Sequence, residues 1–193
     1  MKSKIHPFLA LFILTSSVHA ANKIWDVVSG DGATITAGNG TWTTGGGNWN
    51  TGAADSTWVS GATPDNAIFQ AADDLGNHIV TVGGAITTAQ TPGLTFSNSG
   101  FTLQAATAQT ITVGTNNITC SLNVATGKTA TIGDHVTVKK NSTNGTFVLL
   151  GGGTLNVGSG SVNGGAALEN TTTNTSFEMR NGITLDLKTG GSL

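Results

Sequence analysis

Charged residues are scarce in this chain: they make up 9% of its 193 residues, against about 25% in an ordinary globular protein. The net charge is −2. The basic excess with which proteins bind nucleic acids is therefore missing, and we expect no nucleic-acid partner. Intrinsic disorder combines low hydrophobicity with high net charge, whereas 37% of these residues are apolar. The chain is expected to fold around a core of its own.

The sequence also has one cysteine, three prolines and no tyrosine. A single cysteine cannot form an internal disulfide, so we expect a fold without disulfide support. Cys120 lies in the alternating segment ITCSLNV, which is typical of a strand. We interpret it as a small buried side chain, because the sequence suggests no histidine partner that would make it a catalytic nucleophile.

The first 20 residues differ in composition from the rest. Lys2 and Lys4 precede an apolar stretch from 8 to 14, and small residues then lead to Ala20. A positive start, a short apolar stretch and a small-x-small end are typical of a secretory signal peptide. The apolar stretch is too short to span a bilayer. We therefore predict a signal peptide over 1–20, cleaved between Ala20 and Ala21, with no transmembrane segment left in the mature chain. A buried N-terminal helix is the alternative.

Glycine and threonine are abundant, with 28 and 33 residues respectively. Apolar residues do not recur at helical spacing, so we expect no helix. Short runs rich in Thr, Val, Ile and Leu recur instead between Gly, Asn and Asp residues, which favour turns. Strands are predicted at 78–82, 93–96, 101–103, 110–113, 118–124, 129–132, 135–140, 146–150, 154–157, 176–180 and 183–187.

A series of this kind is compatible with a sandwich, a barrel or a β-solenoid. The strands are short, the turns leave no room for long crossing connections, and charge is scarce throughout. These features favour the solenoid, in which each coil covers the apolar face of the next. The predicted fold class is therefore all-β, a β-solenoid, with a β-sandwich as the alternative.

The segment from Gly38 to Trp58, GNGTWTTGGGNWNTGAADSTW, holds three of the four tryptophans. A solenoid exposes an apolar cross-section and unpaired backbone at its ends. Because all four indoles precede the regular strands, we predict a Trp-rich cap and first coils over 21–75, followed by coils over 76–193. As an alternative, Trp42, Trp49 and Trp58 could stack on sugar rings as a glycan-contact platform.

The sequence pattern resembles the start of passenger regions that carry autotransporter-associated β-strand repeats, a family of bacterial surface and secreted proteins. The residues that carry the resemblance are Trp42, Gly45 to Trp49, Trp58, Asn66 to Phe69, Val80 to Val82, Gly93 to Phe96 and Gly100 to Leu103. The segments 151–162 and 181–193 look like further members of the repeat, so the resemblance covers 25–193.

This resemblance implies a right-handed parallel β-helix that is exported to the outer surface of a bacterium or secreted. Family members are structural or adhesive, so extracellular glycans or cell surfaces are the partners it implies. The sequence shows neither the strand series of a translocator barrel nor a basic sorting tail. We therefore expect a chain truncated within the coils, or an open C-terminal coil that self-associates end to end.

Candidate chemistry is sparse. Asp73 and Asp74, with His78 nearby, form the densest polar group, and they could bind Ca²⁺ or act as an acid pair. A solvated loop is the simpler interpretation. Asp26 and Asp31 are expected to be isolated surface or turn residues, and the pair Lys139-Lys140 a solubilising strand end. We assign no catalytic, cofactor-binding or metal-ligating residue and expect no cofactor.

The leading functional hypothesis is an exported, non-enzymatic β-helical passenger or adhesin-type protein, which acts by mechanical display and repeated surface contacts. Two alternatives stay open: a polysaccharide-binding module that uses the tryptophans, and a polysaccharide lyase or hydrolase on the same scaffold.

Overall fold

The computed structural model of the chain describes residues 20–114, 119–140, 144–162, 164–170 and 175–193. Within these ranges the chain forms strands, turns and loops, and none of its segments is a helix long and apolar enough to cross a membrane. The predicted signal peptide lies outside the described residues except for Ala20, so its cleavage before Ala21 stays a prediction.

The strands form three sheets, and each is extended by one strand per turn of the chain. In spatial order, sheet A contains β17 (Thr175–Met179), β14 (Gly145–Leu150), β11 (Cys120–Val124), β8 (Leu94–Phe96), β5 (Asn66–Phe69), β1 (Asn22–Trp25), β3 (Trp49–Asn50) and β4 (Asp55–Ser56). Sheet B contains β18 (Thr184–Leu187), β15 (Thr154–Val157), β12 (Thr129–Ile132), β9 (Phe101–Gln104), β6 (His78–Val82) and β2 (Gly40–Trp42). Sheet C contains β19 (Gly191–Ser192), β16 (Ala166–Asn170), β13 (Val136–Lys140), β10 (Gln109–Val113) and β7 (Ile86–Thr88).

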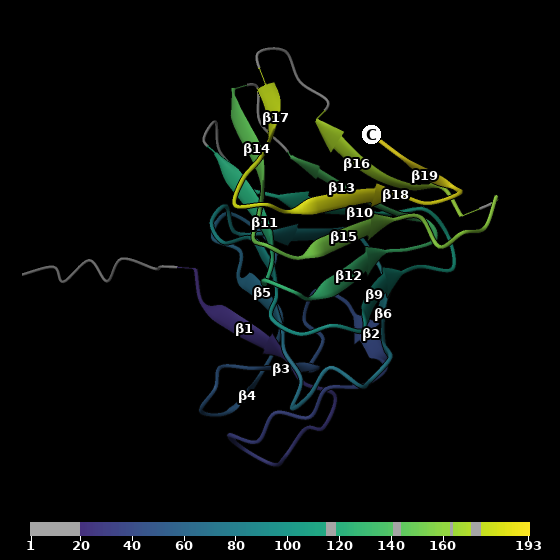
Figure 1. The fold of residues 1–193 in the computed structure, drawn as a ribbon. Helices are drawn as coiled ribbons and strands as arrows, with labels where there is room; N and C mark the ends of the chain where they lie inside the picture. Colours follow the sequence, from purple (N-terminus) through teal and green to yellow (C-terminus); the bar gives the residue numbers. More distant parts are fainter. Residues whose placement is uncertain (1–19, 115–118, 141–143, 163, 171–174) are drawn as a thin grey trace, which may run out of the picture.

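From β5 onward the chain visits sheets A, B and C in rotation, so each strand pairs with the strand three positions later. Every such pairing is parallel. The result is a three-sided β-solenoid of about four turns (Figure 1). This confirms the predicted fold class. The β-sandwich alternative is wrong, because a sandwich packs two antiparallel sheets face to face.

The core consists of side chains that point inward from successive turns and lie in register. In sheet A, Leu122 pairs with Leu94 on one side and Leu149 on the other, and all three are at most 1% exposed. Side chains alternate between the two faces of a strand. The residues between the apolar positions, such as Thr95 and Asn123, therefore face outward and are only partly buried. Burial of one turn thus depends on the turns above and below it.

Several strands were not predicted, either because their composition is not typical of strands or because they are very short. Strand β16 has the sequence AALEN, in which Ala, Glu and Asn have low strand propensity, and β7 and β19 have only three and two residues. The predicted strand 135–140 is one residue too long, because His135 has a φ of 61° and lies in the preceding turn. The predicted strand 118–124 begins outside the described residues, and β11 starts at Cys120.

Glycine at the turns allows successive turns to approach closely, and Gly151 is the clearest case. Its φ is +96°, and a Cβ atom placed there would lie 1.9 Å from the carbonyl oxygen of Val124 in the preceding turn. We expect Gly151→Ala to lower the free energy of unfolding by about 3 kcal/mol or more, because it combines a strained backbone with a backbone clash. Urea unfolding followed by circular dichroism measures this change.

The matched control is Gly84→Ala. A Cβ atom at Gly84 meets nothing within 4 Å, and we expect a change within about 0.5 kcal/mol. Equal effects of the two substitutions would contradict the close approach of turns at Gly151.

Candidate functional site

The four tryptophans form one buried cluster at the N-terminal end of the solenoid. Trp25, Trp42, Trp49 and Trp58 are 0%, 0%, 1% and 1% exposed. Trp42 and Trp58 meet edge to face with ring centroids 4.8 Å apart, and Trp25 meets Trp49 in the same way at 5.2 Å. Edge-to-face contacts are a favoured geometry for aromatic pairs. The indoles thus pack mainly on one another.

This indole cluster closes the first turn of the coils. Phe69 of β5 lies within 5.9 Å of the ring centroids of Trp42 and Trp49, and it stacks on Phe96 of the next turn at 4.8 Å. The aromatic column continues from the cluster into the core of sheet A. The tryptophans therefore cover the end of the solenoid, as the cap hypothesis proposed. The predicted boundary between cap and coils at 75/76 stays a prediction.

The indole N–H groups differ in their partners. Trp25 donates to the carbonyl oxygen of Gly38 at 3.0 Å, and Trp58 donates to the hydroxyl of Ser60 at 3.1 Å. The Nε1 atoms of Trp42 and Trp49 are buried without a hydrogen-bond partner. An unpaired buried donor is destabilising, so these two indoles stabilise the cap through apolar area and ring contacts.

The proposed glycan platform consists of Trp42, Trp49 and Trp58, and all three are buried in this cluster. Stacking on a sugar ring requires an accessible indole face, and each of these residues is at most 1% exposed. Glycan contact at these positions would require the cap to open.

A polar network lies beside the indoles and is centred on Asn50. The Asn50 side chain is 0% exposed and its Nδ2 donates to Asp26 Oδ2 at 3.1 Å and to the Gly32 carbonyl oxygen at 2.6 Å. Asp26 Oδ1 accepts the backbone N–H groups of Val28 and Thr36 at 3.2 and 3.1 Å. Asp26 is 1% exposed. The expectation that Asp26 is an isolated surface or turn residue is therefore wrong.

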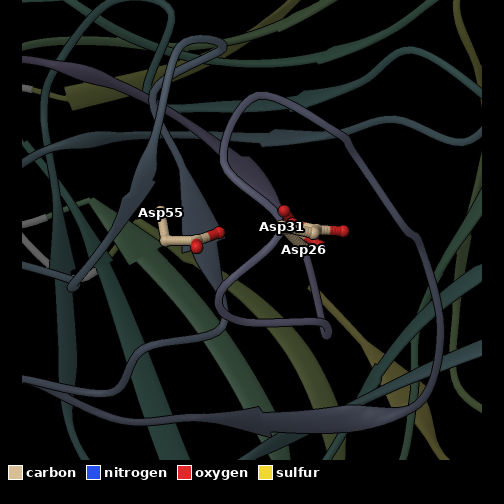
Figure 2. A group of neighbouring side chains, drawn as sticks. All are labelled: Asp26, Asp31 and Asp55. Carbon is tan, nitrogen blue, oxygen red and sulfur yellow. The ribbon is translucent and has the colours of Figure 1, made fainter.

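Asp31 and Asp55 complete this network. Carboxylate oxygens of Asp26, Asp31 and Asp55 lie within 4.8 Å of one another, and Figure 2 shows the Asp55 carboxylate pointing toward the other two. Asp55 Oδ2 accepts the Gly30 N–H at 2.6 Å, whereas Asp31 Oδ1 is buried without a partner. Three carboxylates at this spacing are the residues that could hold a divalent cation.

Asp73 and Asp74, which we considered as a possible acid pair, both lie in the loop after β5. Asp74 accepts from Lys128, from the Ser99 N–H at 2.9 Å and from Asn98 at 3.1 Å. The Lys128 side chain, followed by the Ser99 amide, holds the pKa of Asp74 at about 2, below its ordinary value of 3.8. Asp73 instead caps its own turn by accepting the Leu75 N–H at 3.0 Å. The two carboxyl groups have different partners.

Asp73 and His78 do share a pocket of about 300 Å³, which is otherwise lined by Ile35, Thr36, Ala37, Ala71 and Ala72. The His78 ring packs on Phe101 with centroids 4.7 Å apart, and its Nε2 is buried without a partner. One carboxylate and one imidazole in a largely apolar pocket provide few of the groups that an acid–base mechanism on a glycan needs.

Lys140 and Cys120 face the interior. Lys140 is 1% exposed and donates to the Asn144 carbonyl oxygen at 2.6 Å, so the expected solubilising role of the pair Lys139-Lys140 is wrong for Lys140. Burial lowers the pKa of its ammonium group. Burial also raises the pKa of the Cys120 thiol to about 11. A thiol protonated at neutral pH is a poor nucleophile, which supports the structural interpretation of this cysteine.

Comparisons with protein-family models, with curated proteins and with solved structures gave no match for this chain.

The packing of the indoles in the cap leads to a prediction about Trp49. We expect Trp49→Ala to lower the free energy of unfolding by about 3–5 kcal/mol, because it opens a cavity among the indoles. Trp49→Phe is expected to lose much less, since it keeps most of the aromatic area and removes an unpartnered N–H. Urea unfolding monitored by circular dichroism compares the two. Similar losses in both variants would contradict a role based on packing.

The hydrogen bonds of the polar network lead to a prediction about Asn50. Asn50→Asp removes the side-chain amide that donates to Asp26 and Gly32, and it adds a buried negative charge. We expect a loss of about 3 kcal/mol or more in the free energy of unfolding. The matched control is Asn39→Asp, because Asn39 is exposed and its Oδ1 accepts the Ile79 N–H, a bond that an Asp side chain can also accept. Equal stabilities of the two variants would contradict the central role of Asn50.

Proposed function

We propose that the mature chain is an exported, non-enzymatic β-solenoid that serves as a structural display element, either on the outer surface of a bacterium or released from it. Its function is to present a repeated polar surface to extracellular glycans or cell surfaces. The resemblance of the sequence to passenger regions and the predicted signal peptide support this proposal.

The observation that carries the proposal is the in-register repetition of polar side chains on the outside of sheet B. Thr102, Thr131, Asn156 and Asp186 are partners in successive turns. A second row beside it contains Thr129, Thr154 and Thr184. Neighbouring strands lie about 4.8 Å apart, so the face offers hydroxyl and amide groups at a regular spacing. Such a surface suits many weak contacts rather than one deep site.

The arrangement of acidic residues gives further support. A glycosidase needs two carboxyl groups roughly 5–10 Å apart that face a substrate groove. Asp73 and Asp74 bind different partners, and the closest carboxylate group, around Asn50, is tied to backbone amides of the cap loops. Asp26, Asp55, Asp73 and Asp74 therefore act as supports for turns and loops.

Export is the part of the proposal that can be tested most directly. Expressed with its first 20 residues in a Gram-negative bacterium, the chain is expected to leave the cytoplasm and to begin at Ala21 in its mature form. Cell fractionation followed by N-terminal sequencing measures both. Leu11→Arg, which interrupts the apolar stretch, should block export and processing, whereas Leu11→Ile should not.

A full-length chain that remains in the cytoplasm would contradict export. The non-enzymatic part of the proposal is tested separately with the purified mature chain and a panel of polysaccharides. Cleavage of any of them that is lost in the double variant Asp73→Ala/Asp74→Ala would instead support the enzyme alternative.

A further inference from the structure

The two ends of the solenoid differ. At the N-terminal end, the indole cluster covers the core, and β3 and β4 add antiparallel strands beyond β1. The edge of β7 is also covered, because the Thr87 N–H donates to Ser60 Oγ at 3.2 Å and the Ala89 N–H donates to the Asp65 carbonyl oxygen at 2.8 Å. Sheets A and B end here in β4 and β2, which are only two and three residues long, so this end of the described structure offers a second chain little strand edge to pair with.

The C-terminal end is open over the residues that the structure describes. Strands β17, β18 and β19 are the last strands of their sheets (Figure 1). Met179 and Leu187 occupy the inward positions that Leu149 and Val157 fill one turn earlier. Their exposures are 50% and 48%, against 1% and 0% for the residues in the preceding turn. The last turn therefore shows an apolar cross-section bordered by free strand edges.

The charges along this edge have a symmetry of their own. The segment 178–188, EMRNGITLDLK, begins acidic–apolar–basic and ends acidic–apolar–basic. Ile183 is the centre of this segment. At equal distances from Ile183 along the chain, an acidic residue on one side corresponds to a basic residue on the other: Glu178 to Lys188, and Asp186 to Arg180. The apolar residues Met179 and Leu187 match each other. Such a segment is complementary to a second copy of itself in antiparallel orientation.

We propose that the open C-terminal turn pairs with the same turn of a second copy, tail to tail, about a two-fold axis near Ile183. This axis is perpendicular to the axis of the solenoid. It places sheet A of one chain against sheet B of the other, and it places sheet C of one chain against sheet C of the other. Strand β17 of one chain then lies antiparallel to β18 of the other, and the uncharged β19 meets its own copy.

In this arrangement Glu178 faces Lys188 of the second copy, and Arg180 faces its Asp186. Met179 packs on its Leu187, and both apolar cross-sections are covered. The other two-fold arrangements place a charged strand against β19, which consists of Gly191 and Ser192, so the charges of that strand gain no partner on the other chain. Because the capped ends point outward, the assembly closes at two chains and does not grow into a fibre.

Charge exchange within single strands tests the proposal. Each chain already contains the pairs Glu178–Arg180 at 2.6 Å and Asp186–Lys188 at 2.5 Å. The double variant Glu178→Arg/Arg180→Glu keeps the first pair within its own strand, so it leaves the composition, the net charge and the local ion pair of the monomer unchanged. Between chains, however, it brings like charges together at both positions. The variant Asp186→Lys/Lys188→Asp does the same from β18.

Sedimentation equilibrium of the mature chain, from residue 21 to 193, measures the dissociation constant of the dimer. We expect the wild type to form dimers. The dissociation constant of each double variant is expected to be about tenfold higher, or more. The quadruple variant, which exchanges the charges in both strands, restores the opposite-charge contacts and should recover the affinity of the wild type to within about threefold.

Circular dichroism of all four proteins serves as the folding control. A monomeric wild type, or growth into larger assemblies, would overturn the proposal. Equal dissociation constants in all four proteins would overturn it too, because β17 and β18 of different chains would then not face each other. None of these outcomes bears on export, so the proposed function and the tail-to-tail pairing are tested independently.

Discussion

Stacking of inward-facing side chains in register, from one turn of the solenoid to the next, is the constraint on which the rest of this structure depends. No single turn can bury its own apolar residues, because its strands lie in three different sheets and are only a few residues long. Leu122 is covered only because Leu94 and Leu149 lie on either side of it. The same geometry aligns the outward residues into rows, so the polar face of sheet B follows directly from the packing of the core.

This constraint makes the ends of the solenoid special, and the chain treats its two ends differently. At the first turn, four indoles and Phe69 replace the missing neighbour with a large apolar mass that no strand pairing could supply. The last turn keeps the inward pattern of the coils, and Met179 and Leu187 are half exposed. Its charges alternate in sign within short distances along the free edge, which keeps the edge hydrophilic while making it complementary to its own copy.

The polar network of the cap has the same origin. Loops that cover the first turn must bury backbone groups, and Asn50 and Asp26 provide partners for them. Asp26, Asp31 and Asp55 meet because β3 pairs antiparallel with both β1 and β4. The sequence places Asp55 far from the other two, and no motif links them. Neither this pairing nor the burial of Lys140 has a local signal, because both depend on contacts between segments distant along the chain.

The sequence by itself determined that the chain is all-β, favoured a solenoid over a sandwich, and placed the tryptophans at one end of the chain. Periodicity, turn residues and the position of Trp25 to Trp58 are local properties, and they were enough for these conclusions. Tertiary structure decided the rest: the three-sheet register, strands of low propensity such as β16, the carboxylate group around Asn50, and the exposure of Met179. Each of these depends on which turn lies above or below a given residue, and that neighbour is set by the length of every intervening turn rather than by the residue's own surroundings in the sequence.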